Sequence, residues 1–132
     1  MPNNFGKKLL VAGSVFGFLA VAVGAFGAHA IRDLVSVSQK HTWELGVNYQ
    51  FYHALGLLFL GTYLRKHDKA EWLKRAAWCW AVGIVFFSGS LYLLACRDML
   101  EFPTGWIGPV TPIGGLLFLG GWAMVGWYFL KK

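Results

Sequence analysis

The chain has 132 residues, of which 57% are hydrophobic and 14% are charged. Ordinary globular domains carry roughly 25% charged residues, so this chain has too few charges to cover a water-exposed surface, which excludes an ordinary soluble domain. The formal net charge is nevertheless +6, from 12 Lys and Arg against 6 Asp and Glu. The length predicts a single domain over residues 1–132.

Four apolar segments are each long enough to cross a bilayer, which needs about 20 helical residues. Backbone groups in hydrocarbon must be paired within their own segment, so we expect each segment to be a helix. The short polar connections predict that consecutive helices run antiparallel. The sequence therefore predicts an all-α membrane protein, an up-down bundle of four antiparallel transmembrane helices at residues 9–28, 45–64, 76–95 and 110–130.

The first apolar segment also has features of a secretory signal peptide. Lys7 and Lys8 precede it, and Ala28-His29-Ala30 is similar to a cleavage site with small residues. The apolar run, however, is about as long as a full bilayer crossing. We therefore expect a transmembrane helix that is retained.

Lys and Arg are divided unequally between the two sides of this predicted bundle. Because short cytoplasmic connections carry an excess of Lys and Arg, both termini and the middle connection are predicted to be cytoplasmic. The excess of Lys and Arg is then explained by the orientation of the chain in the membrane, which argues against a nucleic-acid partner. The cytoplasmic side holds Lys7, Lys8, Arg65, Lys66, Lys69, Lys74, Arg75, Lys131 and Lys132, whereas the outer side holds only Arg32, Lys40 and Arg97.

Polar side chains within the predicted helices concentrate in the outer half of the membrane. Counting 1.5 Å per residue from Arg65 places His53 roughly 18 Å above the inner edge of a hydrocarbon core about 30 Å thick. Ser88 and Ser90 lie at nearly the same depth and are expected to be hydrogen-bond partners of Gln50 and His53. Buried polar groups in a membrane either hold helices together or form a functional site. The second reading predicts an outward-facing pocket for a small molecule, a lipid or a partner protein, formed by His29, Glu44, Asn48, Tyr49, Gln50, His53, Ser88, Ser90 and Thr111.

Other functional classes have weaker support in the sequence. No catalytic motif is recognisable, so we expect a protein that is not an enzyme and has no cofactor or metal. An oligomeric transporter or channel for a small solute or ion is the main alternative, but it needs a polar path through the apolar inner half. A metal or haem held by His29 and His53 would require the first helix to break at Gly24 or Gly27, since the two side chains are predicted at different depths.

Small and aromatic residues predict how the helices pack. Small side chains at helical spacing allow close approach of a neighbouring helix, from this chain or from a second copy. In the first segment these are Gly13, Gly17, Gly24 and Gly27. Tryptophans concentrate at membrane interfaces, so Trp72, Trp78, Trp80 and Trp127 are expected at the inner interface and Trp43 and Trp106 at the outer one.

Four short blocks, one in each predicted helix or at its edge, are similar to a known family. They read GAFGAHA at residues 24–30, Tyr49-Gln50 with His53-Ala54-Leu55, FSGSLY at residues 87–92, and TPIGG at residues 111–115 with Gly121-Trp122. In this order they resemble the domain of unknown function 423 family, whose members are similar to the eukaryotic transmembrane protein 256.

The resemblance implies a small multi-pass protein of the bacterial inner (plasma) membrane with four helices and no assigned biochemical role. The lipid bilayer is then its surroundings, and a second copy of the chain or another membrane protein is its expected partner. Six of the candidate pocket residues fall inside the blocks that carry the resemblance: His29, Gln50, His53, Ser88, Ser90 and Thr111.

Overall fold

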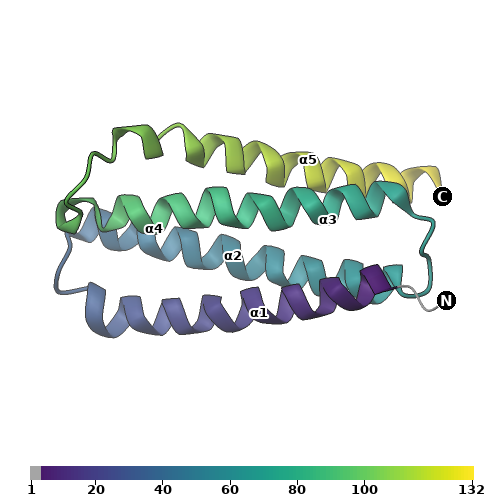
Figure 1. Ribbon diagram of the computed structural model, residues 1–132, viewed down its shortest axis with the longest axis horizontal. Helices are drawn as coiled ribbons and strands as arrows, with labels where there is room; N and C mark the ends of the chain where they lie inside the picture. The colour runs from purple at the N-terminus through teal and green to yellow at the C-terminus, as the bar shows by residue number, and fades with distance from the viewer. Residues whose placement is uncertain (1–3) are drawn as a thin grey trace.

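The computed structural model describes residues 4–132, which form long helices joined by short connections (Figure 1). The helices are α1 (Asn4–Phe26), α2 (Val37–Leu64), α3 (Glu71–Gly83), α4 (Gly89–Ala95) and α5 (Val110–Lys131). A π-helical turn, Gly27–Ile31, extends α1, and a second one, Ile84–Ser88, joins α3 and α4 into one continuous helical segment. Each of the four predicted segments lies within one of these helical stretches.

The second helix begins eight residues before the predicted start at residue 45. Ser36 accepts a hydrogen bond from the backbone N–H of Gln39 at 3.1 Å, and the Gln39 side chain accepts one from the backbone N–H of Ser36 at 2.8 Å. This reciprocal capping box satisfies N–H groups that a helix end would leave unpaired. The part of α2 before residue 45 is polar, so hydropathy alone did not assign it to the helix.

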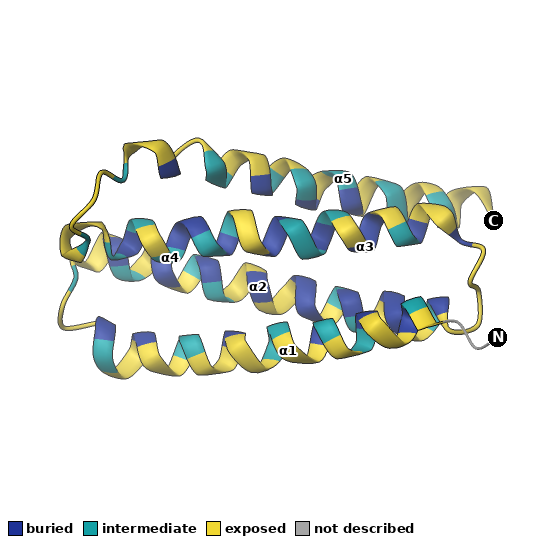
Figure 2. Ribbon diagram, viewed as in Figure 1, coloured by how far each residue is buried: buried dark blue, intermediate teal, exposed yellow. Residues whose placement is uncertain are grey.

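The helices run antiparallel in chain order, and both termini lie at the same end of the molecule (Figure 1). α1 packs chiefly on α2, whereas α5 packs chiefly on α3 and the turn Ile84–Ser88. α2 and the continuous segment α3–α4 therefore form the centre, and α1 and α5 lie on opposite sides of it. Burial follows this order, because α1 and α5 leave about half of their residues exposed and bury only a few (Figure 2).

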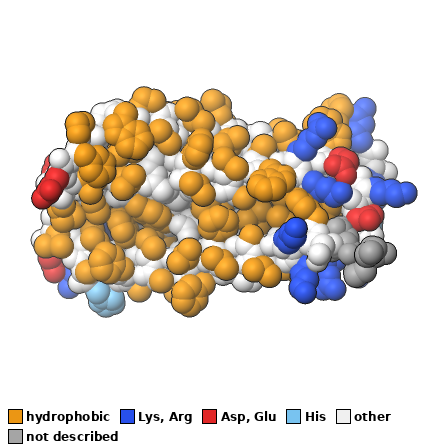
Figure 3. Space-filling model, viewed as in Figure 1, with side chains coloured by type: hydrophobic (Ala, Val, Ile, Leu, Met, Phe, Trp, Pro, Cys, Tyr) orange, Lys and Arg blue, Asp and Glu red, His pale blue; other side chains and the backbone are white. Residues whose placement is uncertain are grey.

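The exterior between the two ends is apolar (Figure 3). Large side chains such as Phe18 and Leu116 are 74% and 67% exposed. Soluble proteins rarely expose contiguous apolar patches of this extent, whereas lipid is the natural surroundings of such a surface. Among residues 4–132, three helical stretches are long and apolar enough to cross a membrane: Asn4–Ile31, Glu71–Ala95 and Gly105–Lys131.

The fourth long helix, α2, is less apolar because it carries Asn48, Gln50 and His53. Two of these three side chains, Gln50 and His53, are buried against neighbouring helices. Most of the polar side chains in this part of α2 therefore point toward the interior of the protein.

Charged side chains gather at the two ends of the molecule. Figure 3 shows most Lys and Arg at the end where the termini lie, and Asp and Glu at both ends. The end with the termini also carries the connection between α2 and α3, residues 65–70. The nine cations predicted on one side therefore share one end of the bundle.

The core fills the half of the bundle nearest the termini. Leu57, Leu60 and Leu64 of α2 are fully buried, as are Leu73 and Trp80 of α3. Trp80 was expected at the membrane interface, and so was Trp43, which is 8% exposed. Both indoles pack inside the bundle instead of on its surface, because each indole N–H donates to a backbone carbonyl of an adjacent helix: Trp80 to Phe118 at 3.3 Å and Trp43 to Val23 at 3.1 Å.

Candidate functional site

Gln50 of α2 links three helices. Its side-chain amide donates to the backbone carbonyl of Phe16 on α1 at 2.9 Å, and its side-chain oxygen accepts from the Tyr92 hydroxyl on α4 at 2.7 Å. Hydrogen bonds between membrane helices contribute about 0.6–2 kcal/mol each. Gln50 therefore ties α1, α2 and α4 together.

The two serines bind partners other than those expected. Ser88 donates to the backbone carbonyl of Gly46 at 2.7 Å, while Ser90 contacts Thr111 at 2.5 Å and donates to the Phe87 carbonyl at 2.8 Å. Neither serine bonds the side chain of Gln50 or His53. A serine hydroxyl reaches only a short distance, and Gly46 has no side chain to keep α4 away from α2, so the backbone carbonyl is the nearer acceptor.

His53 of α2 is held by both ring nitrogens. Nδ1 lies 2.7 Å from the backbone oxygen of Tyr49, and Nε2 lies 3.1 Å from Nε1 of Trp122 on α5. An indole N–H can only donate, so Nε2 must accept and the ring proton must be on Nδ1, which donates to the Tyr49 carbonyl. The contacts therefore fit a neutral imidazole in a single tautomer.

Aromatic rings surround this imidazole. Phe118 stacks on it with ring centroids 3.6 Å apart and an interplanar angle of 7°. Trp80 and Trp122 meet it edge-on at 5.7 Å and 6.0 Å. The ring of His53 is thus fixed in orientation by packing as well as by hydrogen bonds.

A hollow of about 510 Å³ opens beside His53 on the face between α2 and α5. Its lining is mostly apolar and aromatic, which is the usual character of ligand sites. Within the described residues 4–132, the Tyr49 hydroxyl has no hydrogen-bond partner. The lining residues are Tyr49, His53, Phe87, Pro112, Gly115, Leu116, Phe118, Leu119 and Trp122.

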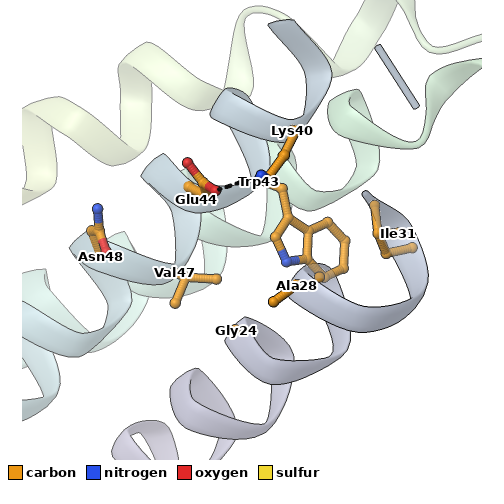
Figure 4. Close-up of a pocket in the computed structure, with 9 residues that line it drawn as sticks. Gly24, Ala28, Ile31, Lys40, Trp43, Glu44, Val47 and Asn48 are labelled. Atoms are coloured by element: carbon orange, nitrogen blue, oxygen red, sulfur yellow. Dashed lines mark ion pairs between the residues drawn. The ribbon is translucent and has the colours of Figure 1, made fainter. Parts of the chain in front are cut away.

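A second, smaller hollow of about 80 Å³ lies between the C-terminal part of α1 with its π-helical turn and the N-terminal part of α2 (Figure 4). Lys40 and Glu44 form an ion pair at 3.8 Å on its edge, and Asn48 lies one turn further along α2. The Trp43 indole packs over Gly27, where an added Cβ would overlap the ring. This volume suffices for a few waters and is too small for a lipid chain.

The nine predicted pocket residues do not share one cavity. Tyr49 and His53 line the larger hollow, whereas Glu44 and Asn48 line the smaller one. His29 lies exposed in the turn Gly27–Ile31. The remaining four, Gln50, Ser88, Ser90 and Thr111, line neither hollow, and their side chains form the hydrogen bonds described above.

Metal binding has no support in the part of the chain that the structure describes. Within residues 4–132 no group of three or more His, Cys, Asp or Glu side chains is close enough to hold an ion. Both nitrogens of His53 are engaged within the protein, so joint ligation with His29 would require breaking the contact to Trp122 or Tyr49.

All four glycines predicted to pack helices face α2, and three of them, Gly13, Gly24 and Gly27, lie close against it. Added Cβ atoms at Gly13 and Gly24 would stand 3.0 Å from Leu58 and 3.2 Å from Val47, whereas Gly17 has room, with its nearest neighbour at 3.9 Å. Sequence reasoning missed the close approach of α5 to α3 and to the turn Ile84–Ser88. There, a Cβ at Gly114 would meet the backbone of Phe87 and one at Gly121 would meet the Trp80 indole.

Sequence reasoning also missed Tyr92, Phe118 and Trp122 as site residues. Tyr92 follows Ser88 by four residues and so shares its helix face, a signal that could have joined it to Gln50. Phe118 and Trp122 show the same spacing along α5. The spacing could therefore have placed Phe118 and Trp122, two of the aromatic partners of His53, on one face of α5.

A family model described as "Protein of unknown function (DUF423)" matches residues 23–115. The chain belongs to the DUF423 family. The matched region covers the larger part of the hollow beside His53, up to Gly115, together with the interhelical bonds of Gln50, Ser88 and Ser90.

Curated relatives of this DUF423 chain are named membrane proteins. A UPF0382 membrane protein of Staphylococcus haemolyticus is 40% identical over 120 residues, covering 90% of this chain and 92% of its own. YwdK of Bacillus subtilis is 35% identical over 119 residues, covering 90% and 93%. YgdD of Escherichia coli, named an inner membrane protein, is 34% identical over 128 residues, covering 96% and 93%.

No solved structure matches the chain. The apolar exterior and these relatives agree on its surroundings, and the DUF423 chain is an integral membrane protein.

Proposed function

We propose that this chain crosses the bacterial inner membrane four times, with both termini in the cytoplasm. α2 is the fourth span, since it is as long as the other helices and turns Gln50 and His53 inward. Nine Lys and Arg at the end with the termini, against three at the other, support this orientation by the positive-inside rule.

Labelling with a membrane-impermeant maleimide tests the topology. In a background carrying Cys79→Ser and Cys96→Ser, a Glu101→Cys variant reacts in intact spheroplasts. A Lys69→Cys variant reacts only after the membrane is permeabilised. Labelling of the second variant in intact spheroplasts would contradict the proposed orientation.

Within this topology the chain acts as a binding protein, not an enzyme, and its ligand is a lipid chain held on the face between α2 and α5. The observation that carries this proposal is the hollow of about 510 Å³ beside His53. Along α5 it extends from Pro112 to Trp122, roughly 15 Å at 1.5 Å per residue. That length corresponds to the outer half of a hydrocarbon core about 30 Å thick.

The chemistry of the lining suits such a ligand. Phe87, Leu116 and Leu119 offer apolar surface to an acyl chain, and the Tyr49 hydroxyl is available to donate to an ester carbonyl. The hollow opens sideways past exposed Leu116 and Leu119, so a lipid can enter from the bilayer without crossing water.

The inner half of the bundle favours binding over transport. Leu57, Leu60, Leu64 and Leu73 fill the interior there and are fully buried. A solute or ion moving past these side chains would lose its hydration without gaining polar partners. The transporter alternative therefore has no observation in its favour.

Native mass spectrometry of protein purified in mild detergent tests lipid binding. We expect one retained phospholipid per chain, and a Leu116→Trp variant, whose indole fills the hollow, to lose it. The matched control is Val15→Trp on α1, which places an indole on an exposed position outside the hollow. Equal retention by both variants, or no retained lipid in the unaltered protein, would overturn the proposal.

A further inference from the structure

One face of α2 is exposed in the structure and carries a regular stripe of side chains. Its members recur at alternating steps of four and three residues, which is the spacing of a coiled-coil heptad repeat. All are exposed except Leu45, which is half-buried. We call it the α2 stripe, and it consists of His41, Leu45, Asn48, Tyr52, Leu55 and Phe59.

Asn48 is the unusual member of the α2 stripe. Its side chain is exposed and makes no hydrogen bond to any described residue of the chain. A Cβ at Gly24 would lie 3.2 Å from Val47, so Asn48 is level with the apolar part of α1 near Val23. Asn48 lies on the edge of the smaller hollow, and its amide is not paired by any described side chain there, so a polar partner from outside the chain would stabilise it.

From these two observations we infer that the chain forms a homodimer through the α2 stripe, with Asn48 of each copy hydrogen-bonded to Asn48 of the other. Copies inserted in the same orientation have parallel α2 helices, so a two-fold axis along the membrane normal brings equal residues to equal depth. A primary amide both donates and accepts, so it is complementary to itself across such an axis. A second copy therefore offers Asn48 both a donor and an acceptor, whereas a lipid ester carbonyl offers only an acceptor.

The heptad spacing of the α2 stripe also supports a second copy of the chain as the partner. Two parallel helices with side chains at this spacing interlock along their whole length. Tyr52, Leu55 and Phe59 supply the apolar contact toward the inner half, and Asn48 fixes the register, as a single buried Asn does in coiled coils. The dimer leaves the hollow beside His53 open, because Tyr49 and His53 lie on a different face of α2.

Disulfide crosslinking in native membranes tests the interface. In the background lacking Cys79 and Cys96, oxidised Asn48→Cys and Leu55→Cys variants should give strong dimer bands. Val15→Cys on α1 and Leu119→Cys on α5 are equally exposed to lipid but lie off the stripe, and should give only background. Crosslinking that is equal at all four positions, or a product with a different protein and no dimer, overturns the proposal.

The role of the amide is tested separately by self-association in detergent. Asn48→Val should weaken dimerisation by about 3- to 30-fold, the range of one interhelical hydrogen bond. Asn48→Gln keeps an amide and should retain much of the affinity. Because Asn48 is exposed, neither change should alter the thermal unfolding of the monomer. A monomeric unaltered protein, or an Asn48→Val dimer of unchanged affinity, overturns the proposal whatever the result for lipid binding.

Discussion

Trp122 on α5 donates its indole hydrogen to Nε2 of His53 on α2 at 3.1 Å. This contact joins two helices whose backbones lie farther apart than those of the other packed pairs. It also forms the inner end of the hollow that we assign to a lipid chain. Several measurable properties of the protein depend on this and a few similar contacts.

The first of these measurable properties is the tautomer of His53. We expect its Nδ1 to carry the proton, because Nε2 must accept from Trp122. Nitrogen NMR of protein with labelled histidine should show a protonated Nδ1 and an unprotonated Nε2 for this residue. In a Trp122→Phe variant this constraint is lost, and the stability should fall by about 0.6–2 kcal/mol. Trp127→Phe, at an exposed position, is the control and should leave both signals unchanged.

Glycine at position 114 is required by the contact between α5 and the turn Ile84–Ser88. A Cβ there would enter the backbone of Phe87, so Gly114→Ala should destabilise the protein by about 1–3 kcal/mol, as overpacked cores do. Gly120 lies on the same helix with open space around it, so Gly120→Ala should change the stability by less than about 1 kcal/mol. Thermal unfolding followed by circular dichroism measures both, and equal effects would contradict the packing described here.

The bond between Tyr92 and Gln50 should be detectable as an energetic coupling. Tyr92→Phe leaves the buried Gln50 side-chain oxygen without its donor and should cost about 0.6–2 kcal/mol of stability. In a Gln50→Leu background the same change should cost less, because the acceptor is already absent. A double-mutant cycle in detergent gives the coupling energy. Strict additivity would show that the hydroxyl and the amide act independently.

Cys96 directly follows α4, where partial burial raises the pKa of its thiol. A raised pKa means less thiolate at a given pH, and the thiolate is the form that alkylates. Cys96 should therefore react with a maleimide more slowly than an exposed thiol, and its rate should still be rising at a pH where the exposed thiol has levelled off. The comparison is a Glu101→Cys variant that also carries Cys96→Ser.

The positions of the helices follow from the sequence because apolar length is a direct physical requirement for crossing a bilayer. Hydropathy did not locate the polar start of α2, which depends on the capping bonds of Ser36 and Gln39. It also could not reveal Trp80 as a core residue. Tryptophan suits both an interface and an interior with a carbonyl acceptor, and the choice depends on how close α5 comes.

The candidate site was only partly predictable. The depth of Gln50, His53, Ser88 and Ser90 could be counted from the charged anchors, but depth does not determine which side chains meet. Gln50 finds a backbone carbonyl on α1, and His53 finds an aromatic face on α5. Those pairings depend on the rotation of each helix about its axis, and the two π-helical turns change that rotation within single segments.

The turn Ile84–Ser88 contains one residue more than a regular helix needs at that point. Deleting any one residue there would turn α4 by about 100° relative to α3. Trp80 and Tyr92 could then no longer both reach their partners on α5 and α2. A one-residue deletion in this turn should therefore break at least one of these two contacts, even though it removes neither Trp80 nor Tyr92.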